Sequence, residues 1–416
     1  MDSLQKTFDE CLKDMPNQLA AVAIARRAKA QGVKLSKREL KRVVEHLGAG
    51  KAGTIRLYRW PWWKSETIEL DITDKDWGQV ENSVSETLDD DVAKMIDSVV
   101  DATSEAVLSS LRRTWPKESR LQERERRRFR KRLRKRWSRG LDQMKMFLSI
   151  AREYGASVNR SVRDDDEFPD KSLRDALTRL HARACQVADE IICLLQDGLA
   201  DGAMARWRTL HEISVVALFL SAKGENAAQR YIEHQVVESL KAATEYNRCC
   251  EALGYEPISD KEYKELKGKC DEAVRRYGDG FKEQYGWAVD FMAPCRPTIR
   301  NIEEAAGIEH LRAHYRMASH DVHANPKGIF FKLGLTDGEN LLLAGPSDAG
   351  LADPGHMTAV SLLQVSIVMG LLSPNLDSLV VLSVLTRMRD EIGEFMLDAH
   401  QGAERAHRQR TGWWVW

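Results

Sequence analysis

The sequence predicts a mainly α-helical protein that carries two short β-hairpins. Apolar residues recur at helical spacing over most of the chain, above all from Leu173 onward. Two β-branched segments of alternating polarity, TIRLY and TIELDI, lie within residues 54–72 and predict the first hairpin. An apolar share of 43% and a charged share of 30% are close to the globular average, so the chain can bury a core. A length of 416 residues favours two or three domains over one.

An N-terminal accessory module is expected over residues 1–110. It begins with helical sequence that is interrupted at Gly32. Ser36 and Glu39 then have the spacing of a capping box, in which each side chain satisfies a free backbone N–H at the start of a helix. The first hairpin follows, and a long helix with acidic residues near its start completes the module.

The segment 112–139 differs in composition from the rest of the chain. It holds 15 Lys or Arg against 3 Glu, a net charge of +12 in a chain whose formal net charge is zero. Because apolar residues persist at helical spacing, we expect an amphipathic helix over 111–160 with a basic outer face. That face would contact the phosphates of RNA or another nucleic acid, or dock on the acidic remainder of the chain. The cations expected to bind nucleic acid are Arg124, Arg127, Arg128, Lys131, Arg134 and Lys135.

The rest of the chain is predicted to be one helical domain over 173–404, preceded by an acidic linker at 161–172. A second, inserted hairpin is expected where IFFKLGL and NLLLAG flank an Asp-Gly turn. The last residues, 405–416, form a tail with no predicted structure. The expected helices span about 173–198, 201–222, 224–252, 259–280, 301–323, 355–372 and 375–404.

Composition and charge exclude several classes of protein. Seven cysteines without any C-x-x-C pair indicate neither a disulfide framework nor a zinc ribbon. Mixed charges at the start of the chain argue against a signal peptide. The most apolar stretch, 359–372, is too short to cross a bilayer and predicts a buried helix. We therefore expect a cytoplasmic protein with no membrane partner and no cofactor.

A segment near residue 320 combines side chains that suit phosphate chemistry. Arg grips phosphate oxygens with a fork of donors, and His gives or takes a proton near neutral pH. The pattern favours a metal-free ribonuclease in which Arg stabilises charge on the scissile phosphate and His is the general acid or base. The alternative is a polar seam that fixes helix packing. The candidates are Arg316, Ser319, His320 and His323, at i, i+3, i+4 and i+7 on one helical face, beside Tyr315.

A second polar group lies on the helix expected over 201–222. Arg208 and Glu212 have the i,i+4 spacing of an intrahelical ion pair, and His211 lies between them. An apolar stretch follows, so these side chains are expected to support the candidate site from the edge of the core. His320 and His323 with Glu212 or His211 could bind a metal ion, but no third ligand is fixed by local spacing, so no metal site is predicted.

Two motifs in these segments resemble a bacterial domain-of-unknown-function family, numbered five-six-seven-seven. They are G-x-x-D-G-A-x-A-R-x-R-T-L-H-E at 198–212 and Y-R-x-x-S-x-x-x-H at 315–323. The resemblance extends over roughly 173–400 and implies a helical domain in a family sometimes tied to mobile or defence loci. It implies no settled activity.

A more distant similarity is to the HEPN superfamily. Its ribonucleases place an Arg and a His four to six residues apart on a helix at a dimer interface. Arg316 and His323, with six residues between them, fit that spacing. The similarity implies a HEPN-like helical domain, a homodimer and a metal-independent endoribonuclease, such as a toxin or an anti-phage defence effector.

The sequence leaves open whether the chain is an enzyme. A non-catalytic nucleic-acid-binding or regulatory protein would keep the basic helix and would not need the Arg and His pair. The geometry of Arg316 and His323 discriminates between the two classes. A face that opens to a cleft or a dimer seam favours the enzyme, whereas a face sealed under other helices favours a scaffold.

Overall fold

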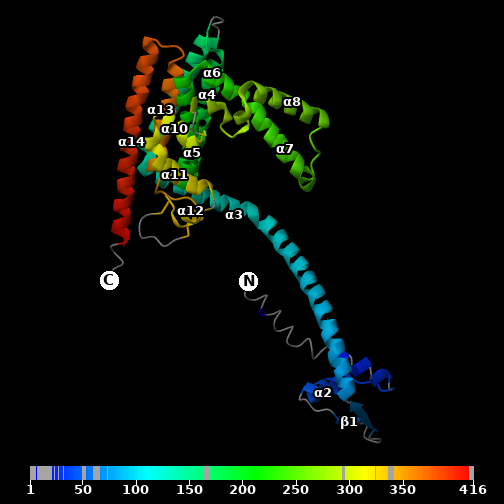
Figure 1. Ribbon diagram of the computed structural model, residues 1–416. Coiled ribbons are helices and arrows are strands. Elements are labelled where there is room, and N and C mark those ends of the chain that lie inside the picture. Colours follow the sequence, from blue (N-terminus) through cyan, green and yellow to red (C-terminus); the bar gives the residue numbers. More distant parts are fainter. Residues whose placement is uncertain are drawn as a thin grey trace. The chain divides into compact units, whose positions relative to one another are not determined.

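The protein is mainly helical and divides into two compact units (Figure 1). The N-terminal unit is Met1–Gln122 and the C-terminal unit is Glu123–Trp416. The computed structural model describes residues 6, 21, 22, 24–26, 28–30, 32–48, 53–59, 66–72, 74–163, 168–292, 296–323, 325–335 and 342–411.

In the N-terminal unit, helix α2 (Lys37–Gly48) begins at the predicted capping box. The Ser36 N–H donates to Glu39 Oε2 at 2.6 Å, and the Glu39 N–H donates to Ser36 Oγ at 3.4 Å. Strands β1 (Gly53–Arg59) and β2 (Glu66–Ile72) follow and pair antiparallel, with Gly53 opposite Ile72. The segment that connects the strands, 60–65, lies outside the described residues.

Helix α3 (Asp74–Arg163) joins the two units through 90 residues of uninterrupted helix. The predicted domain boundary, the acidic segment 161–172, differs from the division found, which falls inside α3 at Gln122. The physical reason is the apolar face of the basic segment. Leu133 and Trp137 are completely buried, so this half of α3 packs in the core of the C-terminal unit.

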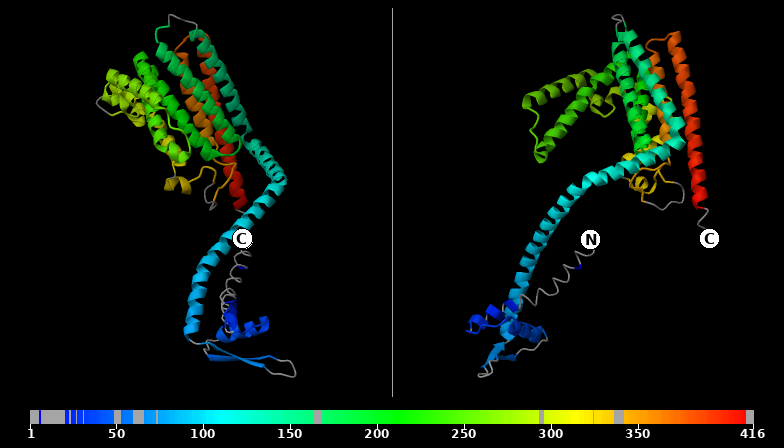
Figure 2. Two further views of the ribbon diagram at one scale, coloured as in Figure 1. Left: turned by 90° about the vertical axis from the view of Figure 1, so that its right-hand side faces the viewer. Right: turned by 180° about the vertical axis from the view of Figure 1, so that it is seen from behind.

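Four further helices pack with α3 around that core. They are α4 (Lys171–Gln196), α5 (Ala200–Lys223), α13 (Ala352–Gly370) and α14 (Leu376–Thr411). Helix α13 contacts α4, α5 and α14, and Figure 2 shows these helices side by side in both views. The apolar stretch 359–372 is therefore a buried helix, as predicted. No helix within the described ranges has the length and apolar character needed to cross a membrane.

Buried polar side chains join α13 to its neighbours. The His181 ring on α4 is 4% exposed, and its Nε2 donates to Ser366 Oγ at 3.2 Å. Burial lowers the pKa of His181 to about 4, because the charged imidazolium would lose its hydration. On α5, the indole N–H of Trp207 donates to the Met357 carbonyl at 2.9 Å.

After a short helix that packs on α4 and α5, two helices leave the bundle as a side arm. Helix α6 (Glu225–Glu233) ends at His234, and α7 (Gln235–Leu253) and α8 (Asp260–Tyr277) pack on each other (Figure 1). The sequence predicted one helix over 224–252, and that prediction is wrong. At this junction His234 Nε2 donates to the Glu283 carbonyl at 2.9 Å, and this bond ties the junction to the loop after α8.

The predicted helix over 301–323 is also two helices. Helix α10 (Ile299–Ala305) ends before Gly307, which has a φ of +73° that only glycine adopts without strain. Helix α11 (Arg312–Val322) begins after a short 3₁₀ turn, Glu309–Leu311. This break turns α11 back against α5, which it contacts.

The inserted hairpin predicted after residue 328 is not present in the described residues. Its first arm instead enters helix α12 (Pro326–Phe330) and continues as a loop through 335, and residues 336–341 lie outside the described ranges. Local capping decides this outcome, because Asn325 Oδ1 accepts the Gly328 N–H at 3.0 Å and Pro326 stands in the first turn. The predicted tail at 405–416 is helical as far as Thr411, because α14 continues that far.

Candidate functional site

The candidate residues on α11 do not share one helical face to the extent predicted. Arg316 is exposed on the helix. Helix α11 ends at Val322, and His323 follows it with extended backbone, φ −104° and ψ 138°. The prediction that Arg316 and His323 stand two helical turns apart on one face is therefore wrong. Two residues after His323, the side chain of Asn325 caps α12.

His323 instead contacts α5. Its Nε2 lies 3.2 Å from Nη1 of Arg208, at the exposed edge of the C-terminal unit. A guanidinium can only donate, so Nε2 accepts and the ring proton sits on Nδ1. Arg208 also donates from Nε to Glu212 Oε1 at 3.1 Å, which confirms the predicted i,i+4 pair. The structure thus places an arginine and a histidine together, but the arginine is Arg208.

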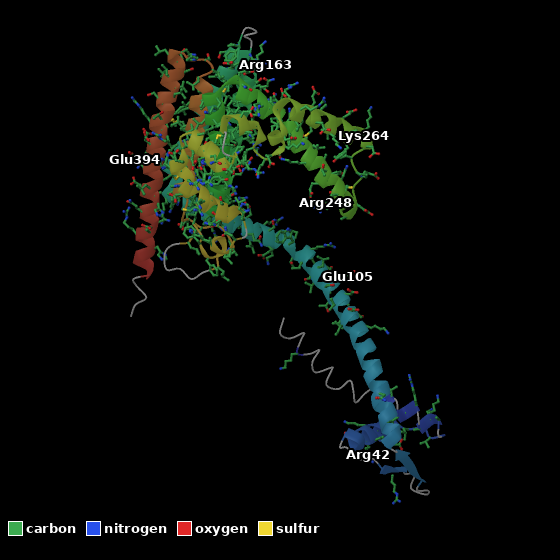
Figure 3. The ribbon with its side chains drawn as sticks, in the orientation of Figure 1. Arg42, Glu105, Arg163, Arg248, Lys264 and Glu394 are labelled. Atoms are coloured by element: carbon green, nitrogen blue, oxygen red, sulfur yellow. The ribbon has the colours of Figure 1, made fainter. Side chains whose placement is uncertain are left out.

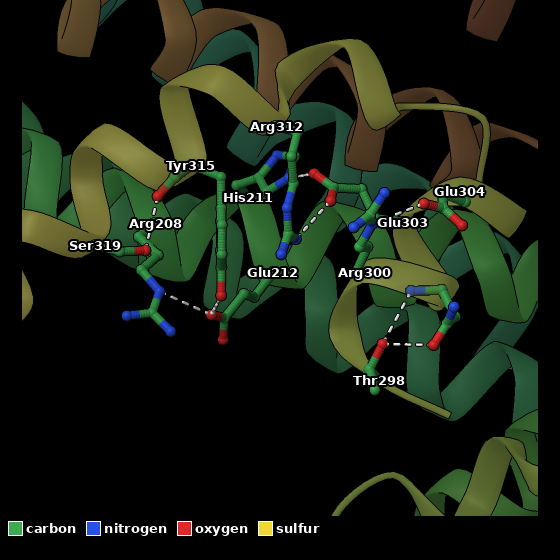
Figure 4. Close-up of polar contacts among 11 residues, drawn as sticks. Arg208, His211, Glu212, Thr298, Arg300, Glu303, Glu304, Arg312, Tyr315 and Ser319 are labelled. Carbon is green, nitrogen blue, oxygen red and sulfur yellow. Dashed lines mark hydrogen bonds and ion pairs between the residues drawn. The ribbon is translucent and has the colours of Figure 1, made fainter. Parts of the chain in front are cut away.

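Tyr315 lies beneath this pair. Its hydroxyl donates to Glu212 Oε1 at 2.6 Å, and the residue is 5% exposed (Figure 4). Burial and the neighbouring Glu212 carboxylate raise the pKa of Tyr315 to about 12. The guanidiniums of Arg208 and Arg312 lie over the ring, 4.9 and 5.0 Å from its centroid. Tyr315 is therefore a protonated hydrogen-bond donor that positions Glu212 and Arg208.

Ser319 and His320 are held by local contacts. The Ser319 hydroxyl donates to the Tyr315 carbonyl one turn earlier at 2.8 Å. The Asn325 amide donates to His320 Nδ1 at 2.6 Å, which leaves the Nε2 of His320 as the protonated ring nitrogen. Both residues are half-buried. They shape the turn between α11 and α12, where the Ser319 carbonyl accepts the His323 N–H at 3.2 Å.

His211 belongs to a different, fully buried network. Its ring is completely shielded from solvent, and Nε2 donates to Glu303 Oε1 at 2.8 Å (Figure 4). Glu303 is 1% exposed and its second oxygen accepts from Arg312 Nη1 at 2.8 Å. Burial lowers the pKa of His211, although Glu303 acts in the opposite direction. His211 supports the packing of α5 on α10 and α11, as a buried histidine needs a partner.

Sequence reasoning missed Glu303, Arg312 and Asp321. Glu303 and Glu304 are adjacent and identical in type, and the structure buries Glu303 while Glu304 stays exposed. The carboxyl of Asp321 on α11 has its pKa raised to about 6 by burial and by the nearby Asp201 carboxylate. A perturbed carboxyl of this kind carries no signal in the sequence, because Asp201 is 120 positions away.

No cluster of three His, Cys, Asp or Glu side chains with metal-binding geometry occurs in the part of the chain that the structure describes. The two groups in contact here are the guanidinium of Arg208 and the ring of His323. A guanidinium beside a ring nitrogen repels a cation and attracts an anion. The chemistry of this pair therefore fits a phosphate better than a metal ion.

The basic half of α3 has two distinct faces within the C-terminal unit. On one face, Phe129, Leu133 and Trp137 pack against the core. Arg126 and Arg130 on the same side pair with Asp197. This part of α3 is thus anchored to acidic residues of the chain, which was one of the two outcomes left open by the sequence.

The opposite face of α3 is exposed. Its cations repeat every three or four residues, so they line one side of the helix with a rise of about 5.4 Å per turn. Arg127 pairs with Glu123 on its own helix, and Arg134 lies 3.6 Å from Asp142. Within the described part of the chain, the other four have no hydrogen bond or ion pair. We call these six residues the basic face: Arg124, Arg127, Arg128, Lys131, Arg134 and Lys135.

The anchored side of α3 and the Arg208–His323 pair both connect to the N-terminal half of α5 or to the residues just before it. The anchoring Asp197 immediately precedes α5, which begins at Ala200. Asp201 accepts the Leu333 N–H at 2.9 Å, and this bond holds the segment after α12 to the first turn of α5. Arg208 is two turns further along the same helix.

Comparison with known proteins gives a family match for one region of the chain. Residues 174–340 match a family of unknown function, DUF5677. The matched region begins within α4 and contains α5 to α12, so it includes both Arg208 and His323. It ends before α13, whereas the sequence motifs led us to expect a resemblance as far as residue 400. No curated protein and no solved structure matches the chain, so the HEPN-like fold stays a prediction.

Proposed function

We propose that the C-terminal unit binds RNA or another nucleic acid through the basic face of α3. One observation carries this proposal: the anchored side of the helix satisfies its cations with Asp197, while four cations on the opposite side have no partner in the described residues. A rigid, exposed row of cations attracts the phosphate backbone without sequence preference. Because the helix is already packed, binding does not have to order it.

A charge-reversal variant tests this proposal. The change is Arg124→Glu, Arg128→Glu, Lys131→Glu and Lys135→Glu in the full chain. We expect the plot of log K against log salt concentration for a fluorescein-labelled RNA to lose about 3 units of slope, since each phosphate contact on a single strand contributes about 0.7. Fluorescence anisotropy over a salt series measures the slope.

The matched control carries the same change of charge on the side arm, where Lys264 is exposed on α8 (Figure 3). It reverses Lys261, Lys264, Lys267 and Lys269. We expect this variant to keep most of the wild-type slope. An equal loss of slope in both variants would mean that net charge alone governs binding, and the basic face would lose its role.

The second candidate function is metal-independent cleavage of RNA, as a toxin or an anti-phage defence effector. The contact between His323 Nε2 and Arg208 Nη1 favours it. Arg208 and the exposed Arg316 would bind the scissile phosphate. When Arg208 moves from His323 to the phosphate, His323 Nε2 would be free to accept the proton of the 2′-hydroxyl. The 2′-oxygen attacks phosphorus, the bond to the 5′-oxygen breaks, and that oxygen leaves with a proton from solvent. The products are a 2′,3′-cyclic phosphate and a 5′-hydroxyl.

Cleavage of total RNA in the presence of EDTA tests this candidate. We expect His323→Ala to reduce the cleavage rate by at least about 100-fold, the usual contribution of a general acid or base. His310→Ala is the matched control, because His310 is an exposed histidine just before α11. If wild-type protein binds RNA and does not cut it, the non-catalytic nucleic-acid-binding function holds and the Arg208–His323 pair is structural. The homodimer expected from sequence also stays a prediction.

A further inference from the structure

Three apolar residues beside the candidate site are exposed to an unusual degree. Phe330 is 84% exposed, Ile329 is 67% exposed and Phe331 is 47% exposed. They lie at the end of α12 and in the residue that follows it. Aromatic side chains normally bury their rings in a folded domain, so two exposed neighbouring phenylalanines mark a surface that meets a partner.

The backbone that carries these residues is fixed at several points. Asn325 caps α12 and also donates to His320 Nδ1. Gly328 packs on the His320 carbonyl so closely that a Cβ at that position would lie 2.2 Å from the oxygen. After the two phenylalanines, the Leu333 N–H bonds to Asp201. The rings are therefore presented to solvent by a constrained turn.

Two lysines flank the exposed rings in the sequence. Lys327 is exposed on α12, and Lys332 follows Phe331 directly. The Asp201 anchor of this turn lies four residues from Asp197, the anchor of the basic helix. Flat apolar rings beside positive charge match the two parts of a single-stranded nucleic acid, its bases and its phosphates.

We propose that Phe330 and Phe331 form a stacking platform for the bases of single-stranded RNA, next to the Arg208–His323 pair. The inference rests on the proposed function, because the basic face must bring the strand to this turn. The platform makes the surface prefer single-stranded over double-stranded RNA, a preference that phosphate contacts alone do not give. Unpaired bases have free faces to stack on the rings, whereas the bases of a duplex are already stacked on one another.

Variants at Phe330 in the full chain test the platform. The probes are a fluorescein-labelled 12-nucleotide single-stranded RNA and the same strand annealed to its complement. We expect Phe330→Ala to weaken single-strand binding about fivefold or more, from the usual contribution of one base stacked on an aromatic ring. Duplex binding and the slope of log K against log salt stay at wild-type values. Phe330→Trp restores single-strand binding, whereas Phe330→Leu does not, because leucine keeps the apolar volume and loses the flat ring.

Each other result overturns the platform in a recognisable way. If Phe330→Leu binds like wild type, the residue contributes apolar contact without stacking. If Phe330→Ala changes the oligomeric state and leaves RNA affinity unchanged, the rings bind a protein. If wild type shows salt-dependent binding that the basic-face variant loses while all Phe330 variants bind like wild type, only the platform fails. Absence of any RNA binding by wild type removes the proposed function and the platform together.

Discussion

Replacing Glu303 by alanine is expected to lower the free energy of unfolding by about 3–5 kcal/mol, the usual cost of removing one partner of a buried charged pair. The carboxylate is 1% exposed and is shared by His211 and Arg312. Its loss leaves a fully buried histidine without a hydrogen bond at Nε2, and the Nδ1 of that ring already has no partner in the described residues. Arg312 loses its counter-charge at the same time.

Urea denaturation of the full chain, followed by circular dichroism, measures this effect. Glu304→Ala is the matched control, because Glu304 is the next residue and pairs with Arg300 on the surface (Figure 4). We expect the control to change the free energy of unfolding by less than about 1 kcal/mol. A difference below about 1 kcal/mol between the two variants would show that the His211–Glu303–Arg312 network is not a stabilising element.

The sequence predicted the bundle helices better than the site, for a physical reason. Helices α4, α5, α13 and α14 each present a broad apolar surface, which the periodicity of the sequence records. A site depends on single residues. The predicted helix ended at His323 and the observed helix ends at Val322, a difference of one position. That one residue changes the backbone of His323 from helical to extended and directs its ring to Arg208.

The prediction of an inserted hairpin was wrong for a similar reason. Alternating apolar residues around an Asp-Gly turn are typical of a hairpin. The pattern does not show that a helix cap competes with the strand. Asn325 and Pro326 start a short helix, and this helix includes the first residues of the predicted strand. The basic face was easier to predict, because long stretches of charge with apolar residues at helical spacing leave few other arrangements. The acidic partners of the anchored side of α3, Asp197 and Asp348, could not be predicted, since they are distant in sequence.

Replacing Trp207 by alanine is expected to lower the free energy of unfolding by about 3–5 kcal/mol, the usual cost of truncating a buried aromatic residue. Trp207 is completely buried on α5. Its ring lies 5.1 Å from the His211 ring, and its N–H bonds both the Met357 carbonyl and Ser361 Oγ on α13. Trp207 therefore joins α5 to α13 both by packing and by hydrogen bonding.

A second variant separates these two contributions. Trp207→Phe keeps most of the ring and removes the N–H, so we expect a loss of about 1–3 kcal/mol from the missing indole hydrogen bonds and the smaller ring. Trp115→Ala is the control, because Trp115 is 56% exposed and its removal leaves no cavity. Urea denaturation measures the free energy of unfolding of the three variants. If Trp207→Phe is as damaging as Trp207→Ala, the hydrogen bonds to α13 hold the helices together; if Trp207→Phe equals wild type, packing alone does so and the N–H is dispensable.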